Sequence, residues 1–367
     1  MAEYFIGLMS GTSLDGVDAA IVAFEPTGFR VVATRYEPFS ADLRQRLQTV
    51  CFADSVAMES LGGLDAELGE LFGACVNRLL DVSAVGREEV IAIGSHGQTV
   101  FHRPHGQYPF TLQIGDPNRI AEVSGISTVA DFRRRDIACG GQGAPLVPAF
   151  HGYAFQQTDS FRVVVNIGGI ANLTVLPPKG RKGLSGFDSG PGNTLMDRWA
   201  LKHLGNPIDR DGRWARSGRL DTALLNRLLG DPYFQRLPPK STGQEYFSLS
   251  WLEQALGGEL RAPEDIQCTL CHLTANSIAL AVHASCPGAK AVLVCGGGAH
   301  NGYLMECLAH VLPCRVTTTA EFGVDPDWVE AVAFAWLARQ TVNGQAGNAP
   351  EATGAEGGRV LGGFYRA

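Results

Sequence analysis

The sequence predicts an α/β protein made of two lobes that share one plan. Its 367 residues exceed the usual length of a single domain, and 45% hydrophobic against 18% charged residues is typical of a globular chain with a large core. An order of strands, helix and strand recurs from residue 161, and each copy has a Gly-rich turn between its first two strands. We therefore expect a nucleotide in a cleft between two α/β lobes.

The first lobe is expected to span residues 1–145 and to be completed by part of the C-terminal segment. It opens with short apolar runs separated by turn residues, which predict an antiparallel meander of Tyr4–Met9, Val17–Phe24 and Phe29–Tyr36. Apolar residues then recur at helical spacing between Leu61 and Leu79. An apolar strand at Val90–Ile93 follows and runs into a polar segment.

The second lobe is expected to span residues 146–367. Strands are predicted at Arg162–Ile167 and Leu173–Leu176, with a third that ends near Phe187. Helices are predicted at Thr194–Leu204 and at about 264–285, before a strand at Ala291–Cys295.

The C-terminal part is expected to contain one further helix and then a loop. Asp325 has the form of an N-cap with proline at the first helical position, and the helix would run to about Gln340. Residues 344–363 are rich in Gly, Ala, Pro and Glu without periodicity, so they predict a loop before a short terminal strand.

Charge and composition exclude several classes of partner and location. A net charge of −7 gives no basic field for a phosphate backbone, so we expect no nucleic acid partner. No run approaches the roughly 18 apolar residues of a membrane span, and the first residues do not form a secretory signal. The odd count of 9 cysteines, scattered through apolar segments, favours reduced thiols and a cytoplasmic location.

Lysine is scarce, which limits how the chain could bind phosphate. Only five lysines stand among 30 cationic residues, at Lys179, Lys182, Lys202, Lys240 and Lys290. Neither a P-loop nor a dinucleotide motif that opens a helix is present. Phosphate binding would therefore depend on backbone amides, hydroxyl groups and a metal ion.

The turn between the first two strands is the first candidate site. It consists of Gly11, Thr12, Ser13, Leu14, Asp15, Gly16, Val17 and Asp18. Glycines let a backbone approach phosphate oxygens closely, and the hydroxyl groups can add hydrogen bonds. Asp15 and Asp18 could hold Mg²⁺, which prefers carboxylate and water oxygens. The alternative is an ordinary hairpin turn.

Further Gly-rich turns lie in the second lobe. The first occupies the matching place there and includes Asn166, Gly168 and Gly169. Gly296, Gly297, Gly298 and Asn301 follow a strand, as expected where backbone passes close to an adenosine or a phosphate. The alternative for the second of these turns is tight packing between strand and helix.

Two carboxylates and one arginine could carry chemistry. Asp188, expected at a strand end and close to Asn193, could take a proton from water; the alternative is that it caps the following helix. Glu330 is the only charge between Asp327 and Arg339, so it is either in a salt bridge or in a site. An arginine of the run Arg133 to Arg135 could bind a substrate carboxylate, although such a run is more often a solvated face.

A polar segment in the first lobe suits sugar recognition. It supplies the neutral polar groups of Ser95, His96, Gln98 and Thr99, and the alternative is a structural histidine. A separate segment, Cys268 to His272, matches the haem pattern C-x-x-C-H. It lies in an apolar helical stretch without a second C-x-x-C, so we expect buried thiols there.

Taken together, these motifs resemble the anhydro-N-acetylmuramic acid kinases over nearly the whole chain. The motifs are GTSLDGVD at 11–18, SHGQTVFH at 95–102, DFRRRD at 131–136, GGQGAPLVP at 140–148, NIGGIAN at 166–172, DSGPGN at 188–193 and GGGAHN at 296–301. The resemblance implies RNase H-like lobes of the sugar kinase, Hsp70 and actin type. Ser189 stands where we expect threonine to be commoner in the family, but the hydroxyl group is kept.

The resemblance also implies a reaction and a homodimer. ATP and water would convert 1,6-anhydro-N-acetylmuramic acid to N-acetylmuramic acid 6-phosphate and ADP, in the recycling of cell-wall peptidoglycan. Asp188 would be the base, Glu330 a second carboxylate at the sugar, and Arg133 a cation at the reacting centre or at the lactyl carboxylate. Residues 11–18 would hold the phosphates and Mg²⁺, and residues 296–301 the nucleotide.

Two other functions stay open at this point. A conventional hexosamine kinase would phosphorylate a free hydroxyl group and need no water. A non-enzymatic, ATP-dependent switch or sensor of muropeptides would need a partner-binding segment, and none is evident in the sequence.

Overall fold

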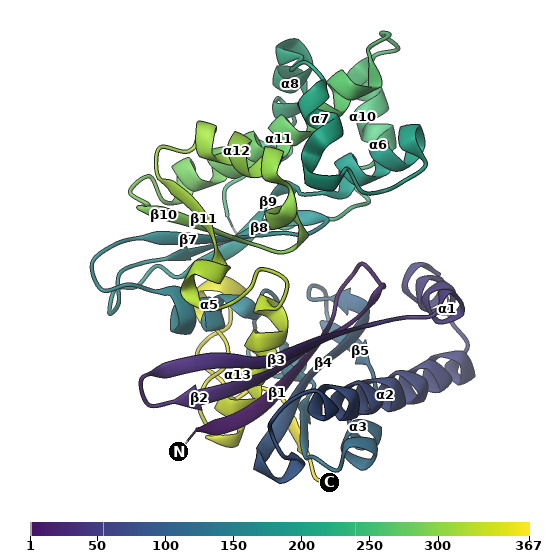
Figure 1. Cartoon of the computed structure of the whole chain (residues 1–367), viewed down its shortest axis with the longest axis vertical. Coiled ribbons are helices and arrows are strands. Elements are labelled where there is room, and N and C mark those ends of the chain that lie inside the picture. Colours follow the sequence, from purple (N-terminus) through teal and green to yellow (C-terminus); the bar gives the residue numbers. More distant parts are fainter. Residues whose placement is uncertain (1, 54, 239) are drawn as a thin grey trace. The chain divides into compact units, whose positions relative to one another are not determined.

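The chain folds into two compact units, shown by a computed structural model that describes residues 2–53, 55–238 and 240–367 (Figure 1). Unit 1 consists of the residues up to Ala154 together with Trp328–Ala367, and unit 2 is Phe155–Asp327. The expected boundary after residue 145 lies earlier than the observed one. The reason is helix α5 (Val147–Phe155), whose Phe150 ring lies 5.8 Å from Phe29 and 6.2 Å from Trp336 of unit 1.

Unit 1 is built around one sheet. Its strands are β1 (Glu3–Ser10), β2 (Gly16–Glu25), β3 (Gly28–Pro38), β4 (Val90–Arg103), β5 (Phe110–Ile114), β6 (Thr128–Ala130) and β12 (Gly363–Tyr365). Besides α5, its helices are α1 (Ala41–Phe52), α2 (Met58–Asp81), α3 (Pro117–Ser124), α4 (Phe132–Ile137), α13 (Val329–Val342) and α14 (Pro350–Thr353).

The strand order of this sheet is β12-β6-β4-β1-β2-β3, with β5 paired to β4. Strands β1, β2 and β3 pair antiparallel, which confirms the expected meander, and β4 runs parallel to β1 and β6. Strand β4 extends ten residues past its expected end at Ile93, because Gln98 pairs with Ser10 and Thr99 pairs with Gln113. The polar segment from Ser95 to Thr99 therefore lies inside a strand.

Helices cover both faces of the sheet in unit 1. Ile6 and Leu8 share a core cluster with Leu68 and Phe72 of α2. Gly7 lies between them in sequence, and its Cα faces the backbone of α13. Because successive positions of a strand point to opposite faces, α2 and α13 lie on opposite sides of the sheet. This burial explains why α13 is apolar over most of its circumference.

Helix α13 begins at Val329, so the expected start just after Asp325 is wrong. The Asp325 carboxylate instead accepts a hydrogen bond from the Asp327 backbone N–H at 3.0 Å, as in an Asx turn. The Pro326 carbonyl accepts a hydrogen bond from the Gly296 N–H at 2.9 Å. The Pro326 carbonyl is therefore bonded to a residue that lies outside α13. The helix starts three residues after Pro326, at Val329.

Replacing Gly7 with alanine is expected to destabilise the protein by about 2–3 kcal/mol through overpacking. A Cβ at this position would lie 1.8 Å from the Ala331 carbonyl oxygen and 2.6 Å from the Ala335 nitrogen, both backbone atoms of α13. Urea denaturation measures the effect. Gly63→Ala is the control: no atom lies within 4 Å of its would-be Cβ, so a helix-favouring alanine should raise stability by about 0.5–1 kcal/mol. Equal stabilities of the two variants would contradict the packing assignment.

Unit 2 repeats the plan of unit 1 in its sheet. The strands are β7 (Arg162–Ile167), β8 (Ile170–Leu176), β9 (Ser185–Pro191), β10 (Ala291–Cys295) and β11 (Arg315–Thr318), in the order β11-β10-β7-β8-β9. The first three pair antiparallel, and β10 runs parallel to β7 and β11. This matches the order β6-β4-β1-β2-β3 of unit 1, so the predicted α/β fold with one repeated plan is confirmed.

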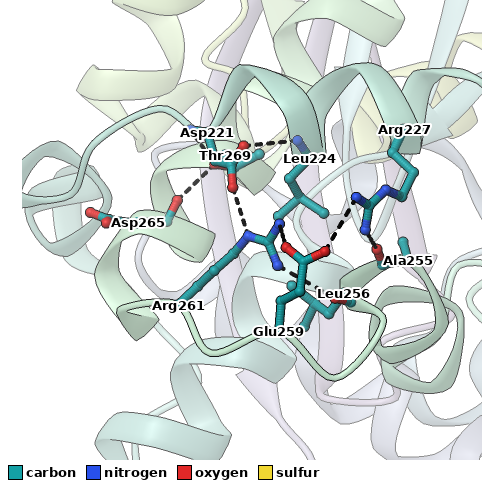
Figure 2. Close-up of polar contacts among 9 residues, drawn as sticks. All are labelled: Asp221, Leu224, Arg227, Ala255, Leu256, Glu259, Arg261, Asp265 and Thr269. Atoms are coloured by element: carbon teal, nitrogen blue, oxygen red, sulfur yellow. Dashed lines mark hydrogen bonds and ion pairs between the residues drawn. The ribbon is translucent and has the colours of Figure 1, made fainter.

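Helices of unit 2 surround the long helix α11 (Pro263–Ser285). The others are α6 (Thr194–Leu204), α7 (Arg213–Ser217), α8 (Thr222–Leu229), α9 (Pro232–Gln235), α10 (Leu249–Leu256) and α12 (Gly302–Val311). Figure 2 shows a polar cluster among α8, α10 and α11. There Arg261 binds Asp221 at 2.6 Å and Glu259 at 2.6 Å, while Asp221 also caps α8 through the Leu224 N–H at 2.9 Å. The half-buried ion pair between Arg261 and Asp221 thus connects the start of α8 to the loop before α11.

Among the described residues, helices long and apolar enough to cross a bilayer are absent. The 9 cysteines are all free thiols.

Candidate active site

The turn between β1 and β2 offers an exposed polar tip. Thr12, Ser13 and Asp15 are exposed, and the Ser13 hydroxyl donates a hydrogen bond to the Asp15 carboxylate at 2.5 Å. Leu14 and Val17 instead place their side chains in the core, with exposed fractions of 3% and 0%. Those two positions can therefore offer a ligand only backbone groups.

Two residues that sequence reasoning missed surround this turn. Arg44 of α1 donates a hydrogen bond to the Ser13 carbonyl oxygen at 3.4 Å, and the Tyr36 hydroxyl donates one to the Asp15 carbonyl oxygen at 2.9 Å. Burial raises the pKa of Tyr36, and the negative charges of Asp15 and Asp18 raise it further. Both carboxylates therefore act on the same phenol. An arginine on an exposed helix carries no motif that could have indicated this position.

Within β4, Gln98 and Thr99 bind other residues of unit 1. The Ser10 hydroxyl lies 2.6 Å from the Gln98 side-chain oxygen and 2.9 Å from the Gly16 carbonyl oxygen. Gln98 in turn donates a hydrogen bond to the Thr99 carbonyl oxygen at 3.2 Å. The Thr99 hydroxyl accepts one from Gln113 at 3.1 Å. These bonds connect the polar part of β4 to both ends of the turn between β1 and β2, and to β5.

Ser95 and His96 line a cavity of about 330 Å³ in unit 1. Its polar lining also includes Asp65, Gln113, Asp131, Arg134 and Tyr365. The Ser95 hydroxyl and the Gln113 side-chain oxygen are buried and have no hydrogen-bond partner among the described residues. Buried polar atoms of this kind are normally satisfied, so a ligand with hydroxyl or amide groups suits the cavity.

Arg133 contacts His96, one of the residues that line this cavity. Its guanidinium donates hydrogen bonds to the His96 Nε2 at 3.0 Å and to the Gly143 carbonyl oxygen at 2.8 Å. Because arginine only donates, Nε2 must accept, and the proton of the ring is on Nδ1. Burial and then the nearby arginine charge lower the pKa of His96 to about 3, so the ring is neutral.

The charge of Arg133 is balanced by carboxylates of unit 1. Burial lowers the pKa of its guanidinium to about 10, while Glu330 and then Asp136 oppose this change. Asp136 also accepts a hydrogen bond from the Gly143 N–H at 2.8 Å, which fixes the turn that holds Arg133. Arg134 and Arg135 are exposed, so the expectation of a solvated face holds for them and not for Arg133.

Three Gly-rich segments meet within unit 2, at the ends of β7, β9 and β10. The Gly192 and Asn193 N–H groups donate hydrogen bonds to Gly169 and Gly168 carbonyl oxygens at 2.9 and 2.8 Å. A Cβ on Gly192 would lie 2.3 Å from the Gly168 carbonyl oxygen, so this approach requires glycine.

The remaining turn residues of unit 2 complete this region. The Asn193 amide donates to the Ile167 carbonyl oxygen at 3.1 Å, and Gly298 packs on the Ile167 side chain. Asn301 is the N-cap of α12, where its side chain accepts a hydrogen bond from the Leu304 N–H at 3.0 Å. The structure therefore brings together Asn166, Gly168, Gly169, Asn193, Gly296, Gly297, Gly298 and Asn301 in one region of unit 2.

Asp188 lies inside β9, which continues to Pro191, and not at a strand end as expected. Its carboxylate accepts a hydrogen bond from the Thr242 N–H at 3.0 Å, and its backbone N–H donates one to the Lys240 carbonyl oxygen at 3.1 Å. Burial raises the pKa of the Asp188 carboxyl to about 6, although the Thr242 N–H and the Lys240 ammonium oppose this. Helix α6 has Asn193 as its N-cap, so Asp188 does not cap it. A carboxyl group of this pKa suits a general base near neutral pH.

Sequence reasoning missed the segment 240–244, which packs on this carboxylate. Lys240 lies with its ammonium 4.8 Å from the ring centre of Tyr233, whose hydroxyl donates to the Asp188 carbonyl oxygen at 2.9 Å. Gln244 lies against Gly169, where a Cβ would be 2.5 Å from its amide nitrogen. The scarcity of lysine is the one signal that could have indicated Lys240.

Comparison with known proteins assigns the family. A family model described as anhydro-N-acetylmuramic acid kinase matches residues 3–367. The chain belongs to the anhydro-N-acetylmuramic acid kinase family. Proteins with this name are 50% identical in Coxiella burnetii, over 99% of this chain and 97% of the relative, and 48% identical in Photobacterium profundum, over 100% and 99%. The resemblance seen in the motifs is thereby confirmed.

Solved structures match the chain at much lower identity. A ROK family glucokinase from Streptomyces griseus, in complex with glucose and AMPPNP, is 14% identical with a TM-score of 0.44, over 92% of this chain and 99% of that one. The activator of the 2-hydroxyisocaproyl-CoA dehydratase from Clostridium difficile is 13% identical with a TM-score of 0.45, over 93% and 96%. Membership of the anhydro-N-acetylmuramic acid kinase family therefore depends on the sequence relatives.

The serine at position 189 has a structural partner in this member of the anhydro-N-acetylmuramic acid kinase family. Ser189 is buried, and its hydroxyl donates a hydrogen bond to the Ala171 carbonyl oxygen at 3.1 Å. A hydroxyl group at this position thus connects β9 to β8 beside Asp188.

Proposed function

We propose that the chain is an ATP-dependent kinase that opens 1,6-anhydro-N-acetylmuramic acid with water and phosphorylates O6. The products would be N-acetylmuramic acid 6-phosphate and ADP, in peptidoglycan recycling. The name of the family supplies the substrate. The observation that carries the chemistry is Asp188, a half-buried carboxyl with a pKa of about 6 beside the Gly-rich turns of unit 2.

Asp188 is proposed as the general base of the ring opening. It takes a proton from water, the water oxygen bonds to the anomeric carbon, and the bond from this carbon to O6 breaks. The released O6 then takes the γ-phosphoryl group, and ADP leaves. A positioned base of this kind contributes about 10²- to 10⁴-fold to such a reaction. One carboxylate thus serves both the hydrolysis and the transfer.

In unit 1, the cavity is proposed as a sugar-binding region. In unit 2, Asn193 is proposed as a substrate-binding residue. Ser95 offers a buried hydroxyl without a partner in the described chain, and His96 is kept neutral by burial and then by the charge of Arg133. Gln98 and Thr99 keep the strand in place through their bonds to Ser10 and Gln113. Arg133 and Glu330 are proposed as the cation and the second carboxylate of the sugar site.

Each unit has Gly-rich turns that are proposed as ATP-binding segments. In unit 1, residues 11–18 would contact the phosphates, and Arg44 adds a cation that compensates for the missing lysine. In unit 2, residues 166–169 and 296–301 would contact the nucleotide. Asp15 and Asp18 are hard oxygen donors beside the same Tyr36, and Mg²⁺ in proteins often binds one or two carboxylates together with substrate phosphates. The ion would neutralise phosphate charge.

A cytoplasmic location and a homodimer are also proposed, from the resemblance to the family. The free state of all 9 cysteines is compatible with a reducing compartment. Light scattering of the purified protein measures the oligomeric state, and a monomer at micromolar concentration would contradict the dimer.

The decisive experiment is mass analysis of the product formed in H₂¹⁸O. Hydrolytic opening places one solvent oxygen on C1 of the sugar phosphate. A conventional hexosamine kinase would give an unlabelled product, and a sensor would give none. Because a free anomeric hydroxyl exchanges with water, unlabelled product incubated in H₂¹⁸O for the same time is the control. Label no higher than in this control would contradict the proposed reaction.

The ratio kcat/KM is expected to fall below about pH 6. The base must be ionised, and the pKa of Asp188 is about 6, so activity decreases about tenfold for each further pH unit. Lys240 lowers this pKa, so Lys240→Met should shift the acidic limb to higher pH. Lys290→Met, an exposed lysine of the same unit, is the control and should leave the profile unchanged. A limb that does not move in Lys240→Met would contradict this electrostatic role.

A further inference from the structure

Two pairs of side chains face each other between α11 and α12. Cys268 and His272 are four residues apart on α11, and Tyr303 and Cys307 are four residues apart on α12, so each pair lies on one helix face. The Tyr303 hydroxyl lies 3.4 Å from the Cys268 sulfur and 3.2 Å from the His272 Nε2. The Cys307 sulfur lies 3.7 Å from the same Nε2. Cys271, next to His272, interacts with the Cys307 thiol, and this interaction raises the pKa of Cys271.

Contacts within this cluster shift the pKa values of Cys307, Cys271 and His272. The hydrogen bond from Cys271, followed by the hydrogen bond and charge of His272, lowers the pKa of Cys307 to about 5. Hydrogen bonds to Cys268 and Cys307 raise the pKa of His272 to about 9. The hydrogen bond to Cys307 and burial raise the pKa of Cys271 well above its usual range. These shifts favour the thiolate form of Cys307, which lies between the His272 imidazolium and the Cys271 thiol.

The cluster is largely shielded from bulk solvent. The three sulfurs belong to buried residues, while His272 and Tyr303 are half-buried. The Arg216 guanidinium lies 4.9 Å from the ring centre of Tyr303 and is paired with Glu306. Across the described residues, groups of three or more His, Cys, Asp or Glu arranged to hold a metal ion are absent. A metal site is therefore a poor explanation of the cluster.

We propose that Cys307 and Cys271 form a dithiol site that reacts with hydroperoxides. The Cys307 sulfur bonds to the outer oxygen of the peroxide, the O–O bond breaks, and the leaving oxygen takes the His272 proton. The product at Cys307 is a sulfenic acid. The Cys271 sulfur then bonds to the Cys307 sulfur, the S–O bond breaks, and the Cys271 proton leaves with the hydroxyl group as water. In sum, two thiols and one hydroperoxide give one disulfide, one alcohol or water, and one water.

A second thiol pair in unit 2 provides an internal comparison. Burial raises the pKa of both Cys286 and Cys314, and Cys314 adds to the shift at Cys286, so both stay protonated. At pH 6, a thiol with a pKa of 5 is about 90% ionised, whereas one with a pKa above 9 is at most about 0.1% ionised. The lower nucleophilicity of the weaker base removes most of this difference. We expect Cys307 to react roughly tenfold faster than Cys286 or Cys314.

The experiment treats the whole protein with hydrogen peroxide at pH 6. Intact mass and peptide mapping, after alkylation under denaturing conditions, follow each of the cysteines over time. We expect a Cys271–Cys307 disulfide to form first, while Cys286 and Cys314 stay reduced. Equal or faster oxidation of Cys286, Cys314 or the half-buried Cys51 would overturn the proposal.

Two variants separate the steps. In Cys271→Ser, oxidation should stop at a Cys307 sulfenic acid that a dimedone-type reagent labels, because the resolving thiol is missing. In His272→Asn, the rate of Cys307 oxidation should fall about tenfold at pH 6, because both the thiolate and the proton donor are weakened. Circular dichroism confirms that each variant is folded before the assay. Absence of sulfenic acid in Cys271→Ser, or an unchanged rate in His272→Asn, would also overturn the assignment. None of these outcomes depends on the proposed kinase activity.

Discussion

Replacing Asp188 with asparagine is expected to lower kcat by about 10²- to 10⁴-fold. Asparagine has the shape of aspartate but cannot take a proton from water. Its side-chain oxygen can still accept the hydrogen bond that the Thr242 N–H donates at 3.0 Å, so the local fold should persist. Initial rates of sugar phosphate formation at saturating ATP and sugar measure the effect.

Asp159→Asn is the matched control for Asp188→Asn. Asp159 is an exposed aspartate of the same unit, so its variant should retain the kcat of the parent protein. Calorimetric titration with an ATP analogue tests whether Asp188→Asn still binds nucleotide. Retained binding with lost turnover supports a base. A kcat within tenfold of the parent value would remove Asp188 from that role.

The repeated plan of the two units could be predicted from the sequence because its strands are locally encoded. Tyr4–Met9 and Val17–Phe24 are apolar runs with turn residues between them, and they appear as the antiparallel strands β1 and β2. The ends of β4 and β9 could not be predicted in this way. Ser95 to Thr99 and Asp188 to Pro191 contain Gly, Ser, Asp and Pro, which have low strand propensity. Pairing with distant strands overrides that propensity.

The start of α13 shows the same competition between local and distant contacts. Asp325 and Pro326 satisfy the local rules for a helix start. The Pro326 carbonyl instead accepts a hydrogen bond from Gly296, 30 positions earlier in the sequence. A rule that considers only neighbouring residues cannot predict this hydrogen bond with Gly296.

In the candidate site, the two carboxylates could be predicted from the sequence, but the residues that contact them could not. Glu330 was indicated because a lone carboxylate inside an apolar stretch requires a partner or a role. Asp188 was indicated by its expected place at a strand end. Their surroundings were not indicated. Thr242 and Lys240 contact Asp188 across more than 50 positions of sequence, and Arg44 reaches Ser13 from a separate helix. Such contacts depend on the tertiary fold and leave no pattern at short spacing.

Replacing Arg133 with methionine is expected to lower kcat/KM by about 10²- to 10³-fold, the usual cost of losing one fixed donor in an active site. Methionine keeps the length of the side chain but removes the charge and the hydrogen bonds to His96 and Gly143. Arg135→Met, an exposed arginine on the same short helix α4, is the control and should change kcat/KM less than twofold. Unfolding by urea should first establish that both variants are folded.

The separate values of kcat and KM then decide between the two roles that remain open for Arg133. If the guanidinium binds the lactyl carboxylate equally in the ground and transition states, KM rises and kcat is preserved, because uniform binding is lost. If it neutralises charge that develops during ring opening or transfer, kcat falls and KM is preserved. Glu330 raises the pKa of Arg133, which keeps a cation in a buried place where it is otherwise costly. Both roles require this charge, and a variant that keeps more than a tenth of kcat/KM would exclude both.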